Sequence, residues 1–228
     1  MQDEILKHTE KVYKELKNSN HSFIEKLKEV GIEIVIIVFA VTLSIWFHSW
    51  SEHGHQQAEA REFLLDLRND IVKDTVSMSN EKKSLNSSLK DYYYVCDLSD
   101  KQMDTIKNFR YNVSLVTRKT NDGNYEGFKS SGKIGFIENK KLKSSILQYY
   151  QEGMPSLSDI EKLNYLKNLE ILEMFGGMSQ KEKPFRNLIL KSKMNLCKQI
   201  SKGIVTAYDE NIKQAKEILS EIDKETKK

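Results

Sequence analysis

An apolar run from Ile34 to Phe47 constrains this chain more than any other feature, because Thr42 and Ser44 are its only polar residues. Both hydroxyls can bond back to the backbone of their own helix. Extended to residues 30–50, the run carries one formal charge, Glu33. As a helix this stretch is about 30 Å long, at roughly 1.5 Å per residue. That length matches the hydrocarbon core of a bilayer, so the sequence predicts a transmembrane helix over residues 30–50.

The residues at the two ends of the run are typical of a membrane anchor. Glu33 falls at one boundary, and Trp46 and Trp50 fall near the other, where indole rings favour the headgroup level. Two other interpretations compete. A buried helix of a soluble protein seldom lacks a polar face over so long a stretch. A cleaved signal peptide would use the AEA at residues 58–60, which lies far downstream. We therefore expect a retained anchor.

Basic residues are unevenly distributed around the run, with more lysines shortly before it (Lys11, Lys14, Lys17, Lys26 and Lys28) than arginines shortly after it (Arg61 and Arg68). This bias predicts a cytoplasmic N-terminus and an exported C-terminal domain. Over the whole chain the net charge is +3, and acidic and basic residues are interleaved. No basic face stands out, so we expect no nucleic-acid partner.

Helix breakers are scarce, with 2 Pro and 10 Gly in 228 residues. The predicted fold class is all-α: a single transmembrane helix that continues into an elongated helical bundle with a long antiparallel helix pair. Three regions follow from the pattern. Residues 1–29 form an amphipathic juxtamembrane segment, residues 30–50 the transmembrane helix, and residues 51–228 a soluble helical-bundle domain.

The long pair is predicted from two apolar stripes with coiled-coil-like spacing, one after the span (Leu64, Leu67, Ile71, Met78, Leu85, Leu89 and Tyr92) and one near the C-terminus (Met194, Cys197, Ile204, Tyr208, Ala215, Ile218 and Ile222). Aligning Thr226 with Gln56 sets Cys197 opposite about Leu85. Cys96 then lies roughly 16 Å away along the helix, beyond the ~7 Å limit for a disulfide. We expect two unpaired, buried cysteines.

Between the two long helices the sequence predicts shorter ones over Ser99–Arg110, Lys140–Gln151 and Ser158–Phe175. The EGMPS stretch at residues 152–156 is expected to separate the last two. Gly176 and Gly177 are expected to end the third, as glycines commonly do.

One set of residues has the spacing of metal ligands. His48, Glu52, His55 and Glu59 would share one face of a helix and could bind Zn²⁺ or relay protons near the membrane surface. Solvated histidines near a membrane surface are commoner, and Gly54 weakens a helix there. We therefore expect neither a metal site nor a cofactor.

Two other motifs resemble binding sites. GFKSSGK at residues 127–133 matches most of a phosphate-binding loop, but Ile134 stands where Mg²⁺ needs Ser or Thr, and no apolar strand precedes it. A glycine-containing helix end is the better interpretation. The tyrosine runs at residues 92–94 and 149–150 could stack on a ligand, although such residues more often pack a bundle and hydrogen-bond at its rim.

Two patches of the chain resemble a bacterial family of single-span membrane proteins of unknown function. Glu33 and Ile34 match the family's Gly-Glu-Ile entry to the span, and Trp50-Ser51-Glu52 matches its Trp-x-Glu exit. The stretch from Ser130 to Gln151 is similar to its Ser-Gly-Lys to Tyr-Tyr patch. Ala40 stands where the family has a mid-span glycine. The resemblance implies a bacterial membrane protein with a single span, and the family supplies no known enzyme activity or ligand. Together with the lysine bias, it predicts an inner-membrane location with a periplasmic C-terminal domain.

These patterns favour a non-enzymatic interaction, scaffolding or sensor-like protein, without excluding an enzyme. We expect the lipid bilayer as one partner, and a second copy or another membrane protein as the other. One alternative is a ligand-binding protein or enzyme whose site lies among the short helices between the two long ones. Another is an effector that perturbs membranes.

Overall fold

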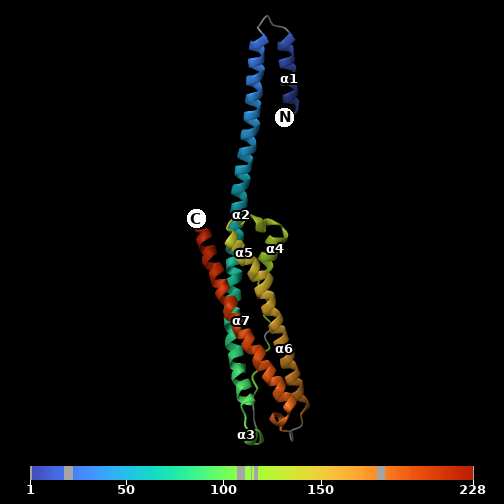
Figure 1. Ribbon diagram of the computed structural model, residues 1–228, viewed down its shortest axis with the longest axis vertical. Coiled ribbons are helices and arrows are strands. Elements are labelled where there is room, and N and C mark those ends of the chain that lie inside the picture. The colour runs from blue at the N-terminus through green and yellow to red at the C-terminus, as the bar shows by residue number, and fades with distance from the viewer. Residues whose placement is uncertain are drawn as a thin grey trace. The chain divides into compact units, whose positions relative to one another are not determined.

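The computed structural model describes residues 2–17, 23–106, 111–113, 115, 118–178 and 183–227. These residues form helices and loops, with no strand among them. The α-helices are α1 (Gln2–Lys17), α2 (Phe23–Cys96), α3 (Asp100–Thr105), α4 (Gly123–Ser130), α5 (Lys140–Gln148), α6 (Met154–Gly177) and α7 (Leu188–Thr226), coloured along the chain in Figure 1. Short 3-10 turns form η1 (Lys133–Phe136) and η3 (Pro184–Arg186), and a π-turn forms η2 (Tyr149–Gly153). The chain is all-helical, as predicted.

The chain divides into two compact units, residues 1–56 and residues 57–228. In the first unit, one helix is long and apolar enough to cross a membrane, and none of its most apolar window is buried. Helix α1 lies beside the start of that stretch, where His8 Nδ1 and Glu33 Oε1 are 2.8 Å apart. A largely apolar groove of about 640 Å³ separates the two helices around this contact. The sequence did not indicate this pairing for Glu33.

In the second unit, both predicted apolar stripes are buried at every position named for them. The stripe on α2 packs against α5, η2 and the middle of α7 in one cluster. A second cluster lies near the end of α2 and includes Met103, Phe185 and the start of α7. These helices therefore bury one face each, as the periodicity indicates.

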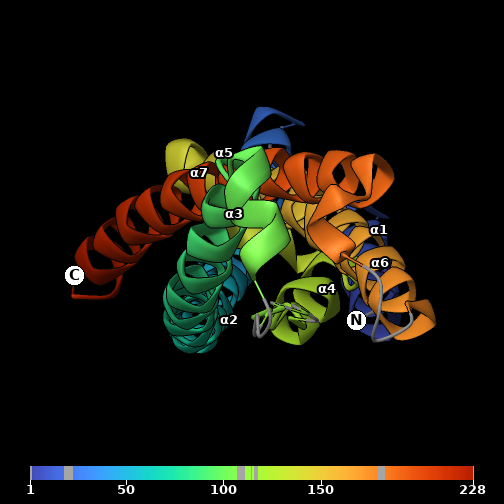
Figure 2. The same cartoon turned by 90° about the horizontal axis from the view of Figure 1, so that it is seen from below.

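Helices α2 and α7 run in opposite directions, and α7 starts beside α6 before crossing toward α2 (Figures 1 and 2). Arg68 Nε donates to Asp223 Oδ1 at 2.7 Å, Lys82 bonds Asp209, and the Arg61 guanidinium donates to the Thr226 carbonyl. Thr226 is therefore level with Arg61, and the expected alignment with Gln56 is wrong.

The corrected register changes the surroundings of the cysteines. By the offset of the Arg68–Asp223 and Lys82–Asp209 pairs, Cys197 is level with about Tyr94 rather than Leu85. Both cysteines are still free; Cys197 is buried and Cys96 is half-buried. Burial raises the pKa of Cys197 to about 11, so its thiol stays protonated at neutral pH. Cys197 therefore behaves as a small apolar residue, whereas Cys96 is less buried than expected.

Some predicted boundaries differ from the observed ones. Helix α3 ends at Thr105, and residues 107–110, expected to continue it, lie outside the described residues. The EGMPS stretch does not separate two helices, because the π-turn η2 joins α5 directly to α6. Pro155 lies in the first turn of α6, where its missing N–H costs little. A Cβ at Gly153 would approach Asn211 Oδ1 of α7 to 2.7 Å, so a larger residue there would displace the Asn211 side chain.

Asn187 caps the start of α7, and replacing it with alanine is expected to destabilise the protein. Its side-chain oxygen accepts from the backbone N–H groups of Ile189 and Leu190, at 3.0 and 3.1 Å. Loss of such a cap costs about 1 kcal/mol, or roughly 2–4 °C in Tm for a domain of this size. Thermal unfolding in mild detergent measures the change. Asn195→Ala, at an exposed position of the same helix, is the control; equal shifts in the two variants would contradict the capping role.

Candidate functional site

The histidine and glutamate set proposed as metal ligands does not converge. Among the described residues, no group of three or more His, Cys, Asp or Glu side chains is close enough to hold a metal ion. In the first unit, Glu52 accepts a hydrogen bond from Gln56 Nε2 at 3.0 Å, and His48 and His55 are exposed. In the second unit, Glu59 forms an ion pair with Lys133 at 2.9 Å.

Trp46 and Trp50, which the sequence predicts to lie near the membrane boundary, stack on each other with ring centroids 6.4 Å apart, and both residues are exposed. The glycine-rich stretch that resembles a phosphate-binding loop is the end of α4: Gly132 adopts φ of +75°, and its N–H bonds the Lys129 carbonyl at 3.0 Å. It is the helix end that the sequence indicated.

The tyrosine runs pack into the protein rather than lining a cavity. Tyr149 and Tyr150 are buried, and Tyr125 stacks on Tyr150 with centroids 4.5 Å apart. Tyr92 is also buried, whereas Tyr93 and Tyr94 are about half exposed. The runs therefore serve mainly as core, as tyrosines in a bundle commonly do.

The most unusual arrangement in the second unit is a buried cluster of charged and polar side chains, which we call the charge cluster: Asp74, Arg118, Glu161 and Tyr208. Asp74 comes from α2, Glu161 from α6 and Tyr208 from α7. Arg118 comes from the loop before α4, and its side chain is only 2% exposed. Burying charges is costly unless they pair, so this cluster is the leading candidate for a functional site.

Within the charge cluster, one cation lies between two carboxylates. Arg118 Nε donates to Glu161 Oε1 at 3.2 Å, and its Nη1 is 3.8 Å from Asp74 Oδ1. The Tyr208 hydroxyl donates to the same Glu161 oxygen at 2.8 Å. The cluster therefore joins three long helices through a single loop residue.

Asn121 also donates hydrogen bonds to Asp74. Its backbone N–H and its Nδ2 both donate to Asp74 Oδ1, at 3.1 and 2.7 Å. One turn earlier on α2, Asp70 Oδ2 accepts from Asn124 Nδ2 at 2.7 Å. The Tyr150 hydroxyl donates to the Asn121 carbonyl at 3.4 Å. Polar side chains of α2 and η2 thus hold the loop that carries Arg118.

Several polar atoms in and near the cluster lack a hydrogen-bond partner among the described residues. They include both terminal nitrogens of Arg118 and the hydroxyl of Tyr149. Burial raises the pKa of Asp74 and of Glu161 despite the neighbouring guanidinium, which lowers both. The charged forms are therefore only partly compensated.

The polar contacts continue along the interior toward the end of α2. Ser201 donates to Asn164 Oδ1 at 3.2 Å, joining α7 to α6. The hydroxyls of Tyr92 and Tyr111 both bond Asn168 Oδ1. Burial raises the pKa of Tyr92 to about 12, so its hydroxyl remains a donor at neutral pH. These pairs specify which faces of α2, α6 and α7 meet.

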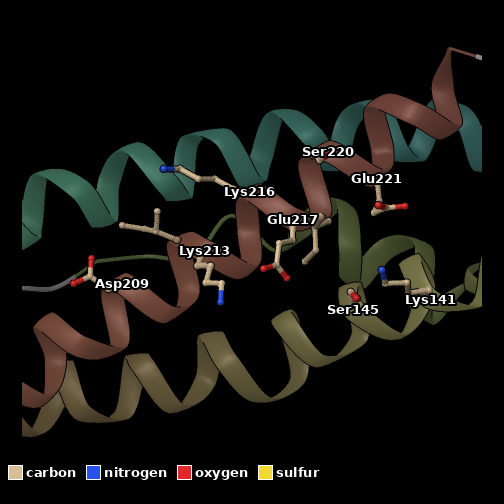
Figure 3. Close-up of a pocket in the computed structure, with 10 residues that line it drawn as sticks. Lys141, Ser145, Asp209, Lys213, Lys216, Glu217, Ser220 and Glu221 are labelled. Atoms are coloured by element: carbon tan, nitrogen blue, oxygen red, sulfur yellow. The ribbon is translucent and has the colours of Figure 1, made fainter.

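The hollows of the second unit lie elsewhere. A groove of about 540 Å³ runs between α5 and α7, and Figure 3 shows Lys213 and Glu217 extending from α7 toward the helix that carries Ser145. Its polar lining mixes cations and anions (Lys141, Lys213 and Lys216 with Asp209, Glu217 and Glu221). A groove with both charges and wide access to solvent selects no single ligand chemistry.

Sequence reasoning missed the charge cluster, although one signal was present. Asp74 lies between Ile71 and Met78 on the buried stripe of α2, where an apolar residue is expected. Glu161 similarly follows Leu157 on the buried face of α6. A charge within an apolar stripe can indicate a buried partner, but Arg118, distant in the sequence, gave no such indication.

The pH dependence of stability is expected to differ in sign between two glutamates of α6. The folded pKa of Glu161 is raised above its ordinary value of 4.5, so its contribution is present below that value and lost as pH rises through the raised pKa. Lys167 and Lys193 lower the pKa of Glu170 to about 2, so its contribution is present above 4.5 and lost on acidification.

Urea unfolding at pH 3, 5 and 7 measures the two effects. Relative to wild type, Glu161→Gln should gain stability as pH rises from 5 to 7, whereas Glu170→Gln should gain as pH falls from 5 to 3. The second variant is the matched control on the same helix. A Glu161→Gln difference that stays constant between pH 5 and pH 7 would contradict a raised pKa.

In comparisons with known proteins, no family model, no curated protein and no solved structure matches the chain.

Proposed function

We propose that this chain is a single-pass membrane protein that acts by interaction rather than by catalysis, as a sensor-like or scaffolding subunit. The observation that carries the proposal is the continuity of α2. One helix, Phe23–Cys96, carries an exposed apolar stretch and then a buried apolar stripe. Within the part of the chain that the structure describes, the most apolar window of the first stretch is left uncovered, so lipid is its natural covering.

The proposed topology follows the basic residues on either side of the span, with a cytoplasmic N-terminus and an exported domain after it. The second unit would then be carried by the same helix that crosses the membrane. The sensor-like role is inferred from the combination of a span and a helical bundle in one chain. The partner would be a second copy or another membrane protein.

Extraction of native membranes with alkaline carbonate tests the anchor. The intact chain is expected to stay in the pellet, and its release would overturn the proposal. Protease treatment of sealed spheroplasts should degrade the second unit if it is exported. Purification in mild detergent after in-cell crosslinking, with mass spectrometry, should recover a stoichiometric partner or a crosslinked dimer. Recovery of the monomer alone would contradict the interaction role.

A further inference from the structure

The contacts that attach the segment Arg118–Asp122 to the rest of the second unit are mainly polar among the described residues. Its sequence, RKTND, has no apolar side chain. Arg118 reaches into the charge cluster, and Asn121 binds Asp74 and accepts from the Tyr150 hydroxyl. Apart from the aliphatic part of the buried Arg118 side chain, the segment has no apolar side chain to hold it against α2 and α6, in contrast to the stripes of the long helices.

The energetic balance of such an attachment is close. Burying Arg118 between two carboxylates removes three charges from water, and the attraction between them roughly offsets that cost. The offset is incomplete, because both terminal nitrogens of Arg118 lack hydrogen-bond partners in the described part of the chain, and the Glu161–Arg118 bond uses Nε alone. Moving the segment into solvent would hydrate all of these groups at once. The closed strap is therefore held less firmly than the apolar core, and its opening needs less free energy than global unfolding.

We propose that Arg118–Asp122 is a displaceable strap, which opens while α2, α6 and α7 stay folded and so exposes the Asp74 and Glu161 carboxylates to water. The inference deepens the proposed function and rests on it for its use, since the strap would be the movable part of a sensor-like domain. In the closed state the strap joins α2 to α6. In the open state that link is absent.

Opening would change how the long helices are linked without unfolding them. The direct pairs between α2 and α7, such as Lys82 with Asp209, do not involve the strap. The Tyr208–Glu161 bond between α7 and α6 would also persist. Among the described residues, opening would break the bonds of Arg118 with the two carboxylates and of Asn121 with Asp74 and Tyr150. Opening of the strap therefore removes a link between α2 and α6 and leaves the direct contacts of α7 with α2 and with α6 in place.

Hydrogen exchange of the full chain in detergent micelles tests the two-state strap. Peptides covering residues 118–122 are expected to exchange at least tenfold faster than peptides from the buried parts of α2 and α7. Their exchange should also stay insensitive to low urea, as for an opening that exposes little surface. Exchange of the strap at the same rate and with the same urea dependence as the core would overturn the proposal, because opening would then require global unfolding.

Two variants test whether the charges control the opening. Arg118→Met removes the cation and leaves the two buried carboxylates without their partner, so strap exchange should rise at least tenfold. The triple variant Asp74→Leu, Arg118→Met and Glu161→Leu replaces charges by apolar groups and should slow strap exchange at least tenfold. If the triple variant fails to fold, the Arg118→Met result decides alone.

Asp209→Asn is the matched control, since it removes a carboxylate that pairs across two helices at the surface. It should leave strap exchange unchanged. Equal effects of Asp209→Asn and Arg118→Met would overturn the assignment of the strap to the charge cluster. All three variants should remain in the carbonate-washed membrane pellet, so a failed strap is distinguishable from a failed anchor.

Discussion

Replacing Arg118 with methionine is expected to lower the free energy of unfolding by about 3–5 kcal/mol at neutral pH. The substitution removes the cation between Asp74 and Glu161, whose side chains are 0% and 3% exposed, and leaves two carboxylates facing each other without compensation. For a chain of this size the loss corresponds to roughly 10 °C in Tm. Urea unfolding followed by circular dichroism in mild detergent measures it.

The pH dependence of this loss separates a charge effect from a packing effect. Burial already raises the pKa of both carboxyls, and without the guanidinium they would be protonated at still higher pH. The penalty should therefore shrink as pH falls toward 5, because neutral carboxyls are cheaper to bury. A loss of equal size at pH 5 and pH 7 would indicate that Arg118 acts through packing.

Arg68→Met is the matched control, because Arg68 also pairs with one carboxylate, Asp223, at 2.7 Å, but at the surface. An exposed pair contributes below about 1 kcal/mol, so the control should lose far less stability than the buried variant. In the open state water reaches both carboxylates, so the Arg118→Met variant can relieve its uncompensated charges by opening the strap. The free energy of unfolding that this variant loses therefore cannot exceed the free energy of strap opening. If Arg118→Met lowers the free energy of unfolding by less than about 1 kcal/mol while its strap stays protected from hydrogen exchange, the stabilising role of the buried ion pairs is contradicted.

The helical architecture was predictable because it depends on local pattern. Scarce Pro and Gly predict helices, and the apolar stripes on α2 and α7 identify the buried face at every named position. The exposed apolar stretch of α2 follows from composition alone. Hydrophobic burial is non-directional, so the buried face of a helix can be predicted from its apolar stripe without knowing which helix packs against it.

The register and the site were not predictable, because both depend on particular pairs distant in the sequence. Stripe spacing leaves α7 free to slide by whole turns along α2, and the observed offset is set by pairs such as Arg68 with Asp223. Likewise, the position of Asp74 within an apolar stripe is explained only by its ion pair with Arg118, which is distant in the sequence. Polar groups specify one arrangement where apolar ones tolerate several.

The proposed anchor makes a prediction with an equally large effect. Val38→Arg together with Val41→Arg should abolish stable membrane integration, since each arginine near the middle of a span costs about 2.5–3.5 kcal/mol on insertion scales. Two such changes amount to roughly a 10⁴-fold shift in the insertion equilibrium. Carbonate extraction followed by immunoblotting measures the fraction of chain left in the pellet.

The same helix supplies the control. Val72 and Val76 are 38% and 55% exposed, comparable to the 58% and 50% of Val38 and Val41, but they lie in the second unit. If α2 were a solvent-exposed helix throughout, the two pairs of Val→Arg changes would be equivalent surface substitutions. If residues 30–50 lie in lipid, the Val38 and Val41 pair should release the chain and the Val72 and Val76 pair should not. Equal retention of both double variants would show that the apolar stretch is not in the bilayer, since two midplane arginines cannot be hydrated there.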